Sequence, residues 1–336
     1  MKLAASLLVI AIVAGATYAA LSYYWLSPTE KFAPPREVTI EKGESFRQIA
    51  RALADAGVVR SEVALRMYGR VSLTASQIKP GDYAFNGGER IPYIMRHLVN
   101  GDFIVVTVTI PEGLTVHEIA ERVAQTGLVC EDEFENAARD GAMVRALGLM
   151  PLGAEGYLFP ATYKFSPHAT TNDVLGAMLA RFYQVLTPEV EKRMFEVGLD
   201  PRRLVTMASI VEKEAKAPAE RPLIAGVFYN RLRLGMPLQS DPTAEYELDG
   251  AKAASAVHTT SAFNTYDFTG LPPGPIANPG LKSIEAALNP TPTDYLYFVA
   301  REGGTHVFSK SYDEHRHIIA EERKAPGGQP AATPVK

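Results

Sequence analysis

The sequence contains a single cysteine, Cys130, in 336 residues, which excludes an intramolecular disulfide framework and a multi-cysteine zinc or iron–sulfur site. It also lacks a basic block, because 34 Lys and Arg residues stand against 38 Asp and Glu residues and the formal net charge is −4. Proteins that bind a nucleic-acid duplex carry a strong basic footprint, so this balance argues against nucleic acid as a partner. Hydrophobic residues make up 46% of the chain and charged residues 21%, which is a globular composition, and the length suggests about two domains.

Several common catalytic signatures are also missing. The chain has neither the G-x-S-x-G of serine hydrolases nor the G-x-x-x-x-G-K-[ST] phosphate loop. His117 is not followed by the second histidine of a zincin, and His315 and His317 are too close in sequence to face one another on a helix, so we assign them to surface packing. Ser76–Lys79 matches S-x-x-K but has no S-D-N or K-T-G companion. We therefore expect no metal site and no cofactor.

A long uncharged stretch lies near the start of the chain. Leu3–Leu26 has 24 residues without a charge, more than the ~20 that a helix needs to cross a bilayer. Tyr23–Trp25 lies where an interfacial aromatic belt belongs, and Lys2 places the short side in the cytoplasm. The alternative is a cleaved signal peptide with Ala14–Ala16 as its cleavage box. With the anchor, residues 1–30 are a cytoplasmic tip and transmembrane segment. Both interpretations predict that the remaining chain lies outside the cytoplasm.

The exported part contains a repeat with an offset of seventy residues. Val38–Val59 and Val108–Val129 both have the pattern of a strand, a glycine turn and an amphipathic helix with a glycine just past its end. A Tyr-x-Phe echo follows at Tyr83–Phe85 and Tyr163–Phe165, and each echo leads into another helix, predicted at 91–99 and 172–183. Two copies are fewer than a solenoid needs, so we interpret them as duplicated small modules.

The first copy resembles a LysM module, which is a small βααβ glycan-binding fold. Val38–Val59 is similar to its opening strand, turn and first helix, and Gly81–Phe85 to its closing strand. The alternative is generic α+β structure without glycan binding. We expect the LysM-like module at 36–105, the second repeat with a catalytic module at 106–325, and a disordered Pro/Gly/Ala-rich tail at 326–336.

The densest candidate chemistry lies between Leu199 and Tyr246. Asp200 is a suitable N-cap, Pro201 suits the first helical position, and Pro218 disfavours helix at the residue before it, so we expect a helix that ends near Lys216. Its apolar stripe comprises Leu204, Met207, Ala208 and Val211. Glu212 and Glu214 fall in its last two turns and point about 200° apart, so they cannot form a carboxylate dyad.

A carboxylate near the end of this helix is a candidate general acid. The negative end of the helix dipole and partial burial both disfavour ionisation, which raises the pKa toward the value that a general acid needs, as in lysozyme. The alternative is a solvated helix end in which Glu212, Lys213, Glu214 and Lys216 have no catalytic role, and the spacing alone favours it.

Rigid Pro/Gly-rich loops follow a second predicted helix, Glu220–Leu234, which Gly235 ends. These loops carry amides, hydroxyls and an aromatic ring, a mixture that suits sugar recognition, although ordinary turn chemistry supplies the same residue types. Their candidate substrate-binding residues are Gln239, Asp241, Asn264 and Tyr266.

Longer motifs in this region resemble the MltG/YceG-like endolytic murein transglycosylases. They are VTMASIVEKE (Val205–Glu214), VFYNRLRLGMPLQSDPT (Val227–Thr243), FNTY (Phe263–Tyr266), TGLPPGPIANPG (Thr269–Gly280) and YLYFVA (Tyr295–Ala300). PEGLTVHEIAERV (Pro111–Val123), EGYLFPATYKF (Glu155–Phe165) and the order of anchor, LysM-like module and catalytic module fit the same family. The resemblance covers nearly the whole exported chain.

The resemblance implies a lyase that cuts peptidoglycan strands between N-acetylmuramic acid and N-acetylglucosamine. In the family the acid is the second Glu of the V-E-K-E element, which is Glu214 here. It would protonate the glycosidic oxygen and then accept a proton from the muramyl C6 hydroxyl, which closes into a 1,6-anhydro ring. Wider lytic transglycosylases often have Ser after this Glu, whereas this chain has Ala215, so that hydroxyl is absent or comes from elsewhere.

We therefore expect an α+β protein with a single N-terminal transmembrane helix, a LysM-like βααβ module and a C-terminal α+β catalytic module. Its expected partners are peptidoglycan glycan strands, the inner membrane and peptidoglycan synthases, and its catalytic part would lie in the periplasm and terminate nascent strands. Two alternatives stay open. A muramidase-type hydrolase would need a second carboxylate, with Asp241, Glu155 and Glu245 as candidates. A non-catalytic glycan-binding scaffold would not need Glu214.

Overall fold

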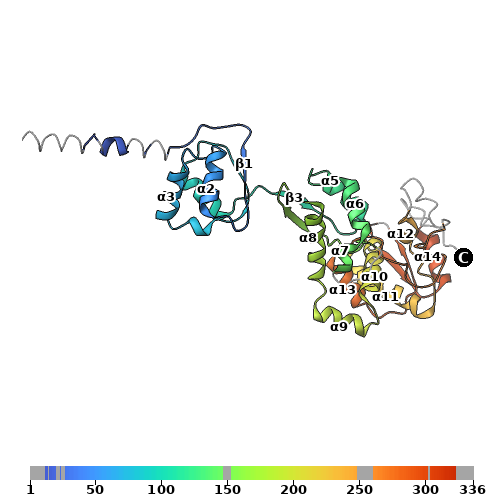
Figure 1. The fold of residues 1–336 in the computed structure, drawn as a ribbon. Coiled ribbons are helices and arrows are strands. Elements are labelled where there is room, and N and C mark those ends of the chain that lie inside the picture. Colours follow the sequence, from blue (N-terminus) through green and yellow to red (C-terminus); the bar gives the residue numbers. More distant parts are fainter. Residues whose placement is uncertain are drawn as a thin grey trace, which may run out of the picture. The chain divides into compact units, whose positions relative to one another are not determined.

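The structure is a computed structural model that describes residues 12–13, 15–19, 23, 27–146, 153–247, 260–301 and 303–322. The chain divides into two compact units: unit 1 comprises residues 1–106 with 164–168, and unit 2 comprises 107–163 with 169–336 (Figure 1). Most of the predicted anchor Leu3–Leu26 and the whole predicted tail 326–336 lie outside the described residues. Among the residues that are described, none of the helices combines the length and apolar character needed to span a membrane.

Unit 1 is a two-stranded antiparallel sheet packed with helices. Its elements in chain order are β1 (Arg36–Ile40), α2 (Phe46–Asp55), α3 (Glu62–Val71), a 3₁₀ turn (Ala75–Gln77), β2 (Gly81–Phe85) and α4 (Ile91–Asn100). Val38 lies opposite Tyr83 in the β1–β2 register, and both side chains are buried. The inward-facing side chains of β1 and the apolar face of α2 therefore pack in one core, which includes Ile49, Leu53 and Leu65.

The second copy of the repeat has the same order of elements. They are β3 (Val106–Thr109), α5 (Val116–Ala124), α6 (Glu131–Asp140), a short added helix α7 (Ala142–Ala146), β4 (Thr162–Phe165) and α8 (Thr171–Tyr183). Ser45 and Thr115 cap α2 and α5 with equivalent capping boxes. Tyr83 and Tyr163 each donate a hydrogen bond to the carbonyl four residues earlier, at 2.6 and 2.5 Å. The sequence repeat is thus also a repeat of local structure.

The rest of unit 2 is mainly helical. Its elements are α9 (Pro188–Glu196), α10 (Pro201–Glu214), a 3₁₀ turn (Pro218–Glu220), α11 (Arg221–Leu234), α12 (Asp241–Glu245), α13 (Leu281–Leu288), β5 (Tyr297–Ala300), β6 (His306–Ser309) and α14 (Tyr312–Glu322). β5 and β6 pair as an antiparallel hairpin, and α14 packs on both strands. In the part of the chain that is described, the sheets are three separate strand pairs, so the architecture is α+β.

Helix α10 is the central helix of unit 2 (Figure 1). Asp200 caps it as predicted by accepting from the Arg203 backbone N–H at 2.8 Å. It ends at Glu214 rather than near Lys216, because Ala215 already adopts an extended conformation. The predicted stripe of Leu204, Met207, Ala208 and Val211 is buried, and the burial extends to every residue from Leu204 to Val211, because α11, α12 and α13 contact the helix.

Candidate active site

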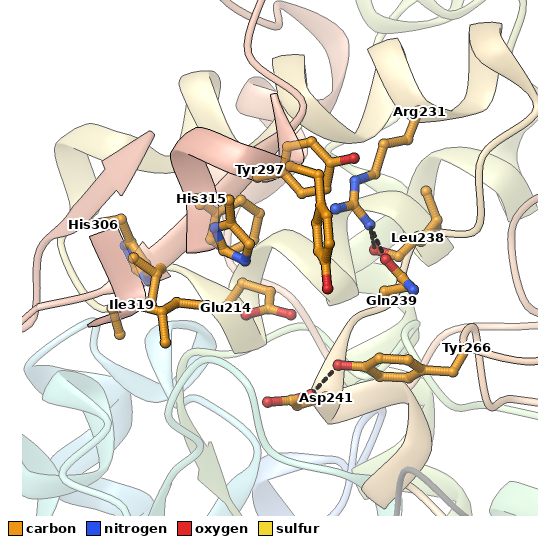
Figure 2. A pocket seen from close by; sticks show the side chains of 14 residues that line it. Glu214, Arg231, Leu238, Gln239, Asp241, Tyr266, Tyr297, His306, His315 and Ile319 are labelled. Carbon is orange, nitrogen blue, oxygen red and sulfur yellow. Dashed lines mark hydrogen bonds between the residues drawn. The ribbon is translucent and has the colours of Figure 1, made fainter. Parts of the chain in front are cut away.

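Glu214 lines a pocket of about 210 Å³ in unit 2. One wall carries three of the predicted substrate residues, Gln239, Asp241 and Tyr266, from the loop after α11, the start of α12 and the 263–266 loop (Figure 2). The other wall comes from β5, β6 and α14. The side chains that line it are Tyr297, Phe298, Val299, His306, Tyr312, His315 and Ile319.

The Glu214 carboxyl is the last side chain of α10 and is largely enclosed. Burial raises its pKa from 4.5 to about 7; the negative charges of Asp241 and Glu245 act in the same direction, and a hydrogen bond from Ser240 and the charge of Arg231 oppose them. The predicted direction of the shift is therefore confirmed, with burial as its largest cause. A group with this pKa is present both as acid and as base near neutral pH.

Ser240 supplies a hydroxyl to Glu214. Its Oγ donates to Glu214 Oε1 at 2.5 Å, and its side chain is almost fully buried. The Ser240 backbone is fixed in turn, because its N–H donates to Thr265 Oγ1 at 3.1 Å and its carbonyl accepts from Thr243 Oγ1 at 2.6 Å. Since Oε1 is occupied as an acceptor, the proton of the neutral acid is placed on Oε2. Sequence reasoning missed Ser240, although it stands between the predicted residues Gln239 and Asp241.

Arg231 stabilises the loop that carries Ser240 through hydrogen bonds. The guanidinium of this buried residue donates to the carbonyls of Pro237 and Leu238 at 3.1 and 2.8 Å and to Gln239 Oε1 at 3.1 Å. Gln239 has a φ of +51°, a conformation that costs a non-glycine residue roughly 1–3 kcal/mol. The hydrogen bonds from Arg231 offset that cost, and the conformation turns the next residue, Ser240, toward Glu214.

Asp241 and Tyr266 are joined across the pocket wall. The Tyr266 hydroxyl donates to Asp241 Oδ1 at 2.5 Å (Figure 2). Burial, followed by the contact with Asp241, raises the pKa of Tyr266 far above neutral pH, so the phenol stays protonated. The pair presents fixed oxygen atoms close to Glu214, as a sugar-binding surface requires.

Asn264 does not line this pocket. It is fully buried, its Nδ2 donates to Asp267 Oδ2 at 3.0 Å, and its Oδ1 accepts from the Tyr266 backbone N–H at 3.2 Å. These contacts assign it to the turn that carries Tyr266. The ordinary turn chemistry that the sequence left open explains Asn264 better than substrate contact.

Tyr297 stands on the opposite wall. The Arg231 guanidinium carbon lies 5.0 Å from its ring centroid, and the His315 ring stacks against it at 5.2 Å and 25°. Figure 2 shows the ring between these two groups with its hydroxyl toward Glu214. His315 was expected on the surface; that prediction is wrong, because α14 folds back onto the pocket. Burial, then the charge of Arg231, lowers the pKa of His315, so the imidazole is neutral.

Residues 38–321 match the family model described as the YceG-like family. The chain belongs to the YceG-like family. It is 35% identical over 315 residues to the endolytic murein transglycosylase of Bacillus subtilis strain 168, with 86% of each chain covered. It is 31% identical over 317 residues to the protein of that name from Streptococcus pneumoniae D39, covering 84% of this chain and 57% of that longer one. A yceG-like protein from Listeria monocytogenes, solved at 2.6 Å, is 30% identical with a TM-score of 0.58, covering 86% of this chain and all of that one.

Glu212 of this YceG-like chain makes structural contacts outside the Glu214 pocket. Its Oε1 accepts from Arg221 Nη2 at 2.8 Å, and its Oε2 accepts from the Gly280 N–H at 3.0 Å and from Ser283 Oγ at 2.8 Å. The carboxylate thereby ties α10 to α11 and to the start of α13. It shares no hydrogen-bond partner with Glu214, as the helix geometry predicted.

Glu155 is also held by the fold of unit 2. It accepts from the Val116 N–H at 3.0 Å, the Tyr246 hydroxyl at 3.0 Å and Asn278 Nδ2 at 2.8 Å. Burial raises its pKa to about 7, and the hydrogen bonds from Val116 and Tyr246 oppose the shift. It lines a separate hollow beside α5 and α6 and does not line the Glu214 pocket; among the residues that the structure describes, the other carboxylate lining that pocket is Asp241.

Proposed function

We propose that this chain is a membrane-anchored endolytic peptidoglycan lytic transglycosylase. It cuts the β-1,4 bond between N-acetylmuramic acid and N-acetylglucosamine and leaves a 1,6-anhydro end. The observation that carries the proposal is Glu214, a partly exposed glutamic acid in the pocket whose pKa is raised to about 7 and whose Oε1 accepts a hydrogen bond from Ser240. The three curated relatives that share the name endolytic murein transglycosylase support it.

In the first step Glu214 acts as the acid. Its Oε2 proton passes to the departing glycosidic oxygen while the bond from that oxygen to C1 breaks, and positive charge develops at C1. The carboxylate that forms keeps the Ser240 hydrogen bond on Oε1 and gains from the positive charge of Arg231. Both groups are already in place, so they stabilise the new charge without rearrangement.

In the second step the same carboxylate acts as the base. It accepts the proton of the muramyl C6 hydroxyl while that oxygen closes on C1, so Glu214 returns to its acid form and no water is consumed. A pKa of about 7 suits both directions of transfer, because neither form is strongly disfavoured at neutral pH. One carboxyl group is therefore sufficient for the whole cycle.

We also propose that Gln239, Asp241 and Tyr266 contact the sugars on either side of the bond. They line the pocket with Glu214 and present amide, carboxylate and phenol groups at fixed positions. Such convergent polar groups in a partly apolar cleft are the usual means of orienting a ligand.

The location is part of the proposal. The apolar run Leu3–Leu26 would anchor the chain in the inner membrane with its catalytic unit in the periplasm, where it would end nascent strands beside peptidoglycan synthases. The β1–α2–α3–β2 order of unit 1 fits a LysM-like glycan-binding module. Loss of normal strand length in cells that carry an unanchored version would support this location, and full restoration by that version would contradict it.

Mass spectrometry of digested peptidoglycan tests the activity. The full chain in detergent should release fragments that end in 1,6-anhydromuramic acid, and Glu214→Gln should lower that rate by about 10²–10⁴-fold. Fragments with reducing ends, one water heavier, would establish a hydrolase instead. Binding of the polymer by the wild-type chain with no fragments would favour a scaffold.

A muramidase-type hydrolase is the second candidate, and Asp241 is the observation that favours it. Asp241 lines the same pocket as Glu214, whereas Glu155 does not. A hydrolase places its second carboxylate about 5–9.5 Å from the acid. If Asp241→Asn abolishes cleavage and the wild-type products are reducing, this candidate replaces the lyase.

A further inference from the structure

Helix α3 of unit 1 carries a row of apolar side chains that the described residues of unit 1 leave largely exposed. Val63, Met67 and Val71 follow one another at four-residue spacing and are 54%, 58% and 82% exposed. Leu73, just past the helix, is 78% exposed and has a φ of +56°, which is rare for leucine. Residues four apart share one face of a helix, so the row is a continuous apolar stripe.

The stripe begins beside the point where the chain leaves its long apolar run. Arg60 Nε donates to the Pro28 carbonyl at 3.1 Å, and Thr29 Oγ1 contacts the Val58 carbonyl at 3.5 Å. Pro28 comes two residues after Leu3–Leu26, and Arg60 comes two residues before α3. The first residues after the proposed anchor are therefore held against the N-terminal end of α3.

The charges around the stripe are mainly positive. The segment 60–73 contains Arg60, Arg66 and Arg70 and one acidic residue, Glu62, so its net charge is 3 − 1 = +2 in a chain of net charge −4. Arg66 pairs with Glu62 at 3.1 Å, and Arg70 is exposed. A basic helix with an apolar face complements a membrane surface that carries anionic headgroups.

We propose that α3 lies along the membrane surface, with Val63, Met67 and Val71 in the headgroup region and its arginines on anionic phospholipids. The inference rests on the anchor in the proposed function, because the contact between Arg60 and Pro28 brings α3 to the bilayer only if the preceding residues span it. Unit 1 is then fixed on the membrane by two elements, the anchor and α3.

Fluorescence quenching in vesicles tests the contact. The full chain, with Cys130→Ser, is reconstituted in phosphatidylglycerol-containing vesicles and labelled at Met67→Cys with a bimane probe. The matched control is Glu37→Cys, an exposed position on β1, the strand that Figure 1 shows on the other side of α2 from α3. Bromine-labelled lipids should quench the probe at 67 several-fold more than the probe at 37, and aqueous iodide should show the opposite order.

Further variants separate the apolar and charged contributions. With the probe at Val63→Cys, the pair Met67→Asp and Val71→Asp should reduce lipid quenching to the level of the control; both positions are exposed, so circular dichroism should be unchanged. Arg70→Gln should lower the ratio of docked to undocked unit about fivefold, the equivalent of ~1 kcal/mol for one arginine at an anionic surface. In vesicles of phosphatidylcholine alone the quenching should fall as well.

The outcomes distinguish this inference from the proposed function. If the full chain does not float with the vesicles, the anchor is wrong and the proposed location falls with it. If it floats and the probes at 67 and 37 respond equally to lipid and to iodide, the anchor stands and the membrane contact of α3 is refuted. Protection of position 67 that arises only when a peptidoglycan synthase is added would assign the stripe to a protein partner and overturn the proposal.

Discussion

Replacing Ser240 with alanine should raise the pKa of Glu214 and shift the pH profile of cleavage. The Ser240 hydrogen bond at 2.5 Å lowers that pKa against the effect of burial, so the resulting value of about 7 should rise when the donor is lost. A hydrogen bond to a charged group contributes about 1.5–3 kcal/mol, and 1.36 kcal/mol corresponds to one pKa unit. The expected rise is therefore roughly 1–2 units.

The assay is kcat/KM for release of anhydro-ended fragments between pH 5 and pH 9. In the wild-type chain the activity should fall as pH rises through about 7, because the acid form of Glu214 is lost. In Ser240→Ala this alkaline limb should lie about 1–2 units higher, and the maximal rate should fall because the weaker acid is a poorer proton donor and its proton is no longer confined to Oε2.

Ser283→Ala is the matched control. Ser283 is also a fully buried serine that donates to a glutamate of α10, in this case Glu212 at 2.8 Å. Its loss should lower stability and leave the pH profile in place. An alkaline limb that stays in position in folded Ser240→Ala would refute the assignment of Ser240 as the residue that tunes and orients Glu214.

Three further predictions concern stability and the second wall of the pocket. The pKa of Glu214 in the folded state lies above its ordinary value of 4.5, so the free energy of unfolding falls as pH rises from about 4.5 to 7. Urea unfolding should therefore show Glu214→Gln to be more stable than wild type at pH 8, by up to about 3 kcal/mol, and equally stable at pH 4. Tyr297→Phe should lower kcat/KM about tenfold with an unchanged melting temperature, whereas Tyr295→Phe, outside the pocket, should leave kcat/KM unchanged. If Tyr297→Phe and wild type have the same kcat/KM, the Tyr297 hydroxyl does not contact the substrate. Glu212→Gln removes the 2.8 Å charge partner of buried Arg221, which keeps only the more distant carboxylate of Glu112 at 3.7 Å. The change should cost about 3 kcal/mol while anhydro products persist, and their loss in folded protein would give Glu212 a catalytic role.

The separation of Glu214 from Glu212 links the fold of unit 2 to the proposed chemistry. A lyase that returns its proton through the substrate needs one carboxyl group that can be both acid and base, whereas a dyad would hold one member ionised. Unit 2 achieves this by turning Glu212 toward Arg221 on the far flank of α10 and by placing Glu214, at the end of the helix, in the wall of the pocket. The same desolvation lowers the stability of the folded state when the Glu214 carboxyl is ionised.

Local features followed from the sequence. Asp200 as an N-cap, the helix end at Gly235 and the opposite directions of Glu212 and Glu214 depend on backbone preferences within a few residues, and short patterns encode those directly. The structural repeat could also be predicted from the sequence, because the same short residue pattern occurs twice with an offset of 70 residues and forms a capping box each time, at Ser45 and at Thr115.

Only the tertiary structure decided the environment of Glu214. Ser240 is 26 residues from its carboxylate, and Tyr297 and His315 come from strands and helices still further along the chain. Desolvation depends on everything packed around a group, and no local pattern shows that Asn264 faces a turn while Gln239 faces the pocket. The V-E-K-E motif predicted Glu214 as the acid, and the packing of distant segments determined its pKa, its orientation and the hydroxyl that donates to it.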